Sequence, residues 1–142
     1  MKKIRIGYVF LAGFVASLAF MLTEMVVEGS VQFIFRISEA EMFIEAFDDL
    51  PSGTLYHVLN LLYLYLVCTL IMWIYAAIRP RFKKRLPAAL ATSAVFWLFV
   101  ILFFVNYSNM GLYPYRMTLM TIGFTLVEVP AAVIAGSCVY RD

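Results

Sequence analysis

Long runs of apolar residues dominate the pattern of this chain, and four of them contain no Lys, Arg or Asp. Each run reaches the roughly 20 residues that an α-helix needs to cross the hydrocarbon core of a membrane. We therefore expect transmembrane helices at about 6–27, 55–78, 86–105 and 117–139. The predicted fold class is all-α, a four-transmembrane-helix bundle that forms one integral membrane domain over residues 1–142.

The connection between the first two runs is the longest, and its pattern predicts a short helix. Ser38-Glu39-Ala40-Glu41 has the spacing of a capping box, in which the serine and the second glutamate bond the first free backbone amides of a helix. An amphipathic helix is expected over about 39–50, on the outer surface of the bundle, and Pro51 would end it. The residues predicted to face inward are Phe43, Ala46, Phe47 and Leu50. Two alternatives stay open for residues 31–37, extended chain or a continuation of the first helix.

Composition agrees with a membrane protein, because 64% of the residues are apolar and only 14% are charged. Soluble domains contain about 25% charged residues. The net charge of +2 predicts no nucleic-acid partner.

The positions of the basic residues predict the orientation of the chain. Nine Lys and Arg lie at the two termini or between the second and third runs, whereas the opposite side has only Arg36 and Arg116. Basic residues in short loops stay on the cytoplasmic side of a membrane. Both termini are therefore expected in the cytoplasm, and the lipid bilayer is the expected surrounding.

The polar residues inside the spans are the candidate site. Glu128 is eleven residues inside the fourth run, about 16 Å deep and near the membrane midplane, where a carboxyl group must be protonated, paired or hydrogen-bonded. Glu24 lies near the outer edge of the first run. His57 and Asn60, spaced i and i+3 at the outer end of the second run, lie on one face at a similar depth. We expect these residues to form an intramembrane polar or ligand site, together with the hydroxyls of Ser17 and Tyr65, which lie at a depth similar to that of Glu128.

Signatures of enzymes are absent from the chain. There is no H-E-x-x-H, G-x-S-x-G, G-x-x-x-x-G-K or Cys-x-x-Cys sequence, so we expect a protein that is not an enzyme and that has no cofactor. Glu24, Glu28 and His57 could in principle offer three ligands to zinc or iron, but no helix carries a His-containing ligand pair. No metal site is predicted.

Two resemblances bear on the fold. The segment Trp73-Ile-Tyr-Ala-Ala-Ile-Arg-Pro-Arg-Phe82, with Glu128 and the ending Tyr140-Arg-Asp142, resembles a family of uncharacterised bacterial four-span integral membrane proteins. This resemblance covers the second half of the chain and implies a fold and a bacterial inner membrane, not an activity. Four spans and an intramembrane Glu are also similar in architecture to the small multidrug transporters, in which a Glu of the first helix binds cations and protons. Those chains are shorter, and their Glu is placed differently.

Two functions of different classes follow as expectations. The first is a non-enzymatic bundle that binds or transports a small ligand, a proton or a cation and uses Glu128. The second is a structural or accessory subunit of a larger membrane complex or a homo-oligomer, in which polar and small residues only hold helices together. The small residues at helical spacing are Gly13, Ser17, Ala89, Ser93, Ala131, Ala132, Ala135 and Gly136.

Overall fold

The computed structural model describes residues 4–36, 38–47 and 53–141, and these are almost entirely helical. A short 3₁₀ helix, η1, interrupts the connection between the third and fourth α-helices. The elements are α1 (Ile6–Phe35), α2 (Glu39–Phe47), α3 (Thr54–Ile78), η1 (Arg79–Arg81), α4 (Arg85–Asn109) and α5 (Tyr115–Val139). The all-α bundle is thus confirmed, and each predicted span lies within a helix.

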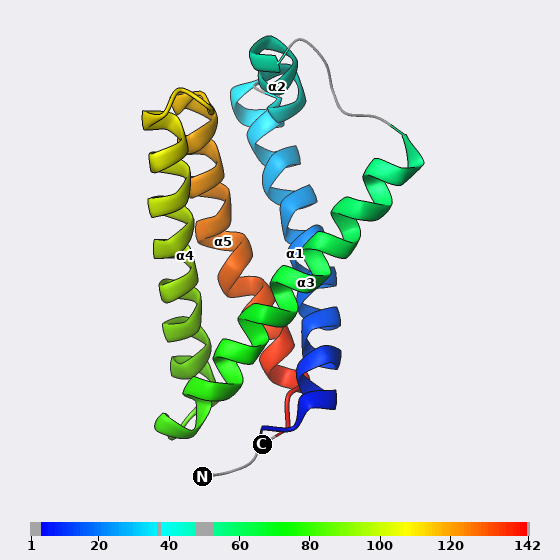
Figure 1. Ribbon diagram of the computed structural model, residues 1–142, viewed down its shortest axis with the longest axis vertical. Helices are drawn as coiled ribbons and strands as arrows, with labels where there is room; N and C mark the ends of the chain where they lie inside the picture. Colours follow the sequence, from blue (N-terminus) through cyan, green and yellow to red (C-terminus); the bar gives the residue numbers. More distant parts are fainter. Residues whose placement is uncertain (1–3, 37, 48–52, 142) are drawn as a thin grey trace.

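The four long helices run alternately up and down, with α1 and α5 as the pair at the centre (Figure 1). On either side of this pair, α4 packs against α5 and α3 packs against α1. We call the end that carries α2 the α2 end. The opposite end carries η1 and both ends of the chain, and we call it the η1 end.

These four helices are long and apolar enough to cross a membrane, and the chain is an integral membrane protein. At most 39% of the most apolar stretch of each helix is buried inside the bundle. The remaining apolar surface is available to lipid, which explains why the helices are hydrophobic on all sides rather than on one stripe.

The hydrophobic core lies in the half of the bundle nearest the η1 end. Small residues on α1, α4 and α5 allow the backbones to approach closely, and Met72 and Tyr75 of α3 fill the space between them. The rings of Tyr75 and Tyr140 meet edge to face at 5.8 Å between centroids. The core residues are Val9, Ala12, Ala16, Cys68, Ile71, Met72, Tyr75, Ala76, Ala88, Ala89, Val129, Ala132, Val133 and Tyr140.

Toward the α2 end the helices separate, because α3 crosses the bundle obliquely and leaves it (Figure 1). All buried residues of α3 fall between Cys68 and Ala76, so no residue in its first half is buried. By contrast, α4 and α5 stay paired along this half. The indole of Trp97 donates a hydrogen bond to the carbonyl of Ile122 (2.9 Å), and the hydroxyls of Ser108 and Thr118 share a hydrogen bond.

The open question on residues 31–37 is settled for residues 31–35, because α1 continues as helix to Phe35. Arg36 then adopts a left-handed conformation with φ of 52°, a common way for a helix to end. Gly29 lies within this helix and does not end it.

The expected helix after Ser38 is also present, but its inward face differs from the prediction. Met42 is the buried residue, with 6% of its surface exposed, whereas Phe47 is 43% exposed and Phe43 is half-buried. The rings of Phe43 and Phe47 pack on each other, 4.7 Å between centroids. Successive residues of a helix point about 100° apart, so a prediction that starts the inward face at Phe43 instead of Met42 turns that face by this angle. Residues 48–50 of the predicted helix lie outside the described residues.

Candidate functional site

Three of the polar residues expected to form a site come together around one hollow. Glu24 of α1 and His57 and Asn60 of α3 line a space of about 380 Å³ near the α2 end. The apolar part of its lining comes from the same two helices, and we call this space the polar hollow. Its remaining lining residues are Phe20, Met21, Leu61 and Leu64.

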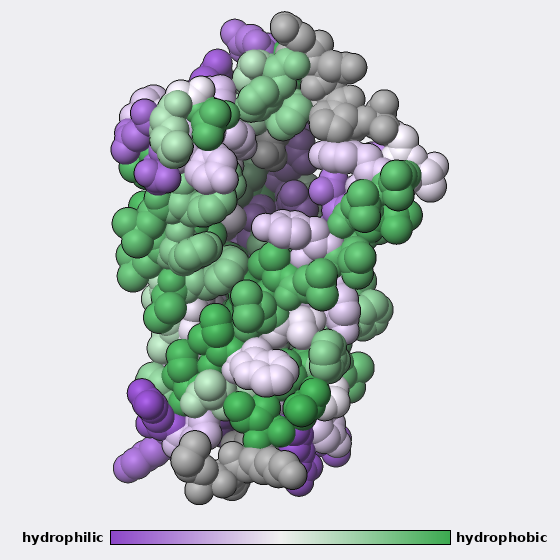
Figure 2. Space-filling model, in the orientation of Figure 1, coloured by the Kyte–Doolittle hydropathy of each residue, from purple (hydrophilic) through white to green (hydrophobic). Residues whose placement is uncertain are grey.

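The crossing of α1 and α3 explains why the hollow exists. At Gly13 the two helices touch so closely that a Cβ there would lie 2.3 Å from the Thr69 hydroxyl oxygen and 2.7 Å from the Thr69 Cα. From this contact the helices diverge toward the α2 end. Asn60 is nine residues, about 14 Å, beyond Thr69 along α3. Figure 2 shows hydrophilic residues recessed beside α3 near the α2 end.

The polar hollow holds the carboxyl group of Glu24. Glu24 has Glu28 one helical turn further along α1, and no Lys or Arg among the described residues lines the space. Within the part of the chain that the structure describes, no basic side chain forms an ion pair with Glu24. A carboxylate at the edge of the hydrocarbon core is costly unless it is paired or hydrated, so this position favours a cation or water.

A second hollow continues from the first along the same two helices, and we call it the apolar groove. It measures about 470 Å³ and shares Met21, Leu61 and Leu64 with the polar hollow. Its other lining residues are Phe14, Ser17, Leu18, Leu62 and Tyr65.

Ser17 and Tyr65 therefore line the apolar groove, next to the other predicted site residues. Their hydroxyls donate hydrogen bonds to backbone carbonyls and not to Glu128. Ser17 donates to the carbonyl of Phe14 (2.8 Å), and Tyr65 donates a long hydrogen bond to the carbonyl of Phe10 (3.5 Å). Both protons are thus directed to backbone oxygens of α1. The groove presents a predominantly apolar wall.

Glu128 occupies a different place, inside the bundle. Only 3% of its surface is exposed, and it lines neither the polar hollow nor the apolar groove. Pro130, two residues further on, lacks the amide that would bond the carbonyl of Leu126 and interrupts the hydrogen-bond ladder of α5.

The register of α1 against α5 gives the level of Glu128. Gly136 packs on α1, where an added Cβ would lie 2.9 Å from the Ala12 carbonyl oxygen and 3.2 Å from the Ala16 Cβ. Eight residues, about 12 Å, separate Gly136 from Glu128, and the same distance along antiparallel α1 leads from Ala16 to Glu24. Glu128 therefore lies at the level of the polar hollow rather than at the level of Ser17.

No metal centre is indicated in the part of the chain that the structure describes. Those residues contain no group of three or more His, Cys, Asp or Glu side chains close enough to hold an ion. Glu24, Glu28 and His57 do not form such a group.

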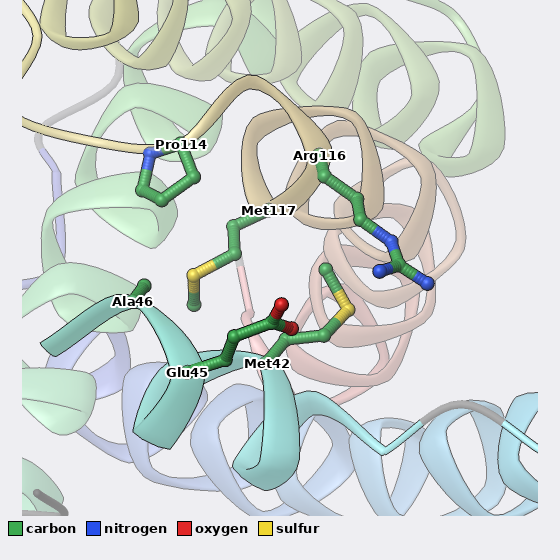
Figure 3. A pocket seen from close by; sticks show the side chains of 6 residues that line it. All are labelled: Met42, Glu45, Ala46, Pro114, Arg116 and Met117. Carbon is green, nitrogen blue, oxygen red and sulfur yellow. The ribbon is translucent and has the colours of Figure 1, made fainter. Parts of the chain in front are cut away.

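A third hollow, which sequence reasoning missed, lies beneath α2. It measures about 250 Å³ and brings Met42 and Glu45 of α2 toward Arg116 and Met117 of α5 (Figure 3). Glu45 and Arg116 line the same space without forming an ion pair. Ala46, which was predicted to face inward, lines this hollow, whereas the prediction did not include Met42.

The small residues expected at helix contacts are mostly used within this chain. Gly13 packs on α3, Gly136 packs on α1 and α3, and Ala89, Ser93 and Ala132 are buried. Ala131 and Ala135 are only partly buried.

Comparisons with protein-family models, with curated proteins and with solved structures give no match to this chain. The inferences about function below therefore rest on its own residues and their arrangement.

Proposed function

We propose that this protein is a non-enzymatic membrane bundle that binds a small cationic ligand at the polar hollow between α1 and α3. The observation that carries the proposal is the meeting of Glu24, His57 and Asn60 around one space where α3 has left the bundle. The volume of about 380 Å³ is within the usual range for ligand sites, roughly 300–1,000 Å³. Glu24 supplies the negative charge, and the imidazole and amide groups supply hydrogen bonds.

Glu128 has a supporting role in this proposal. It is buried among α-helices at the level of the polar hollow, where it holds a proton or a hydrogen bond and fixes α5 behind the site. A transport role that moves a proton or cation through Glu128 would need a path from the hollow to this side chain.

We further propose that the α2 end faces the outside of a bacterial inner membrane. The termini and the basic residues around η1 lie at the opposite end, as the cytoplasmic preference of Lys and Arg requires. In intact cells, a cysteine replacing Met110, which is 64% exposed in the α4–α5 connection, should react with an impermeant thiol reagent. One replacing Lys84 should react only after lysis, and the reverse pattern would contradict this orientation. Cys138 is exposed and is replaced by serine in both variants.

The ligand proposal is tested with two thiol reagents of equal size and opposite charge. In the Asn60→Cys, Cys138→Ser protein in phosphatidylcholine nanodiscs, a trimethylammonium methanethiosulfonate should react about ten times faster than a sulfonate methanethiosulfonate. The Met110→Cys variant at the same end of the bundle provides the baseline ratio. A ratio at position 60 equal to this baseline, or no reaction with either reagent, would favour an accessory subunit that binds no ligand there.

A further inference from the structure

The polar hollow and the apolar groove adjoin each other and differ in chemistry. They share Met21, Leu61 and Leu64, and every described residue that lines either of them belongs to α1 or α3. A ligand can therefore lie along the line where these helices diverge, with one end among polar groups and the other among apolar groups.

The depth of this site matches one leaflet of a membrane. Ile6, the first residue of α1, follows the basic Arg5 at the η1 end, and Glu24 is 18 residues further along, about 27 Å. A hydrocarbon core is about 30 Å thick, so Glu24 lies close to its edge at the α2 end. Phe14 and Leu18, in the groove, are 8 and 12 residues from Ile6, about 12 and 18 Å, on either side of the midplane. The site thus runs from an interface to the middle of the membrane, as a lipid tail does.

The site is open sideways to lipid. Leu61 and Leu62, which line it, are each 51% exposed, and no residue between Thr54 and Val67 of α3 is buried. A molecule already in the leaflet can reach the groove without passing through the core. Water-soluble ligands would use only the polar end.

The charge decides which headgroup fits. Glu24 and the neighbouring Glu28 repel phosphate or carboxylate groups that lack a cation, and in the described part of the chain no basic side chain lines the site to offset them. An ammonium group would pair with Glu24, and Asn60 and His57 would bind its protons or an adjacent hydroxyl.

We infer that the occupant is a long-chain amphiphile with a primary ammonium headgroup, which enters sideways from the leaflet at the α2 end. The ammonium binds at Glu24, His57 and Asn60, and the chain lies along Phe14, Leu18 and Tyr65. This inference rests on the proposed function and adds to it the class of ligand and the direction of its approach.

A photoreactive dodecylamine with a diazirine at the end of its chain tests this inference in phosphatidylcholine nanodiscs. Mass spectrometry should find crosslinks at Phe14, Leu18 or Tyr65, and unlabelled dodecylamine should abolish them. Dodecanol and dodecanoate should compete at least ten times more weakly. Equal competition by these two compounds would overturn the ammonium headgroup.

Variants separate the two parts of the site. Glu24→Gln should lower crosslinking about tenfold, whereas Leu18→Trp or Leu62→Trp should abolish it by filling the groove. Leu11→Trp is the matched control, because Leu11 is 49% exposed on the same helix and lines neither space. Helical circular dichroism shows whether each variant is folded.

Ethylamine distinguishes failure of this inference from failure of the proposed function. If ethylamine protects position 60 from the cationic thiol reagent while the tryptophan variants leave crosslinking unchanged, a small cation binds and the lipid-like ligand is wrong. If ethylamine and dodecylamine both fail to protect position 60 and no saturable crosslink appears in the groove, both proposals are wrong.

Discussion

Alanine in place of Gly13 is expected to destabilise the bundle by about 2 kcal/mol or more. The added methyl group would lie 2.3 Å from the Thr69 hydroxyl oxygen and 2.7 Å from the Thr69 Cα. Because one of these atoms belongs to the backbone of α3, a side-chain rotation cannot remove the clash, and the two helices must move apart. The closely packed half of the bundle depends on this crossing.

The measurement is unfolding in mixed micelles with increasing fractions of sodium dodecyl sulfate. Gly7→Ala is the matched control on the same helix, since nothing lies within 4 Å of the position of its Cβ. This control should be neutral or slightly stabilising, because alanine favours helix more than glycine does. Equal stability of the two variants would mean that α1 and α3 do not cross at Gly13.

The second large effect is expected at Glu128, where the charge of the replacement decides the outcome. Glu128→Gln should remain folded within about 1 kcal/mol of the wild type, because glutamine keeps the size and hydrogen bonding of a protonated glutamate. Glu128→Lys should cost about 3 kcal/mol or more, since it places an ammonium group in a site inside the bundle that is only 3% exposed. Yield of folded protein and unfolding in mixed micelles measure both effects.

The same pair of variants tests the role of Glu128. A folded Glu128→Lys protein of normal stability would show that this position reaches water, as an ion path requires. If Glu128→Gln instead lost dodecylamine crosslinking while Glu24→Gln kept it, the ligand site would lie at Glu128.

Much of the fold could be predicted from the sequence, because the sequence marks where each long helix begins and ends. Apolar runs long enough to cross a membrane, separated by basic residues and prolines such as Pro80 and Pro114, predict the four long helices within a few residues. The arrangement of these helices could not be predicted in the same way. Each helix is apolar all round, so no stripe marks the face that packs, and the contact of Gly13 with Thr69 depends on two surfaces meeting in space.

The candidate site could be predicted in part. Counting residues from the membrane edge placed Glu24, His57 and Asn60 at one depth, and the structure gathers them around one hollow. The same counting placed Ser17 and Tyr65 at the depth of Glu128. The contact of Gly136 with Ala12 and Ala16 instead puts Glu128 closer to the α2 end than Ser17. The apolar groove could not be predicted from the sequence, because it exists only where α3 diverges from α1. Its lining residues are of the same apolar types as other residues that face lipid.

We propose that Glu24 makes the space between α1 and α3 a site for cations. It is tested most directly by the ratio of cationic to anionic modification rates in the Asn60→Cys, Cys138→Ser protein, measured with and without Glu24→Gln. We predict that Glu24→Gln lowers this ratio to the baseline of the Met110→Cys variant, while Glu128→Gln leaves it unchanged. A ratio that stays high after Glu24→Gln would contradict the account.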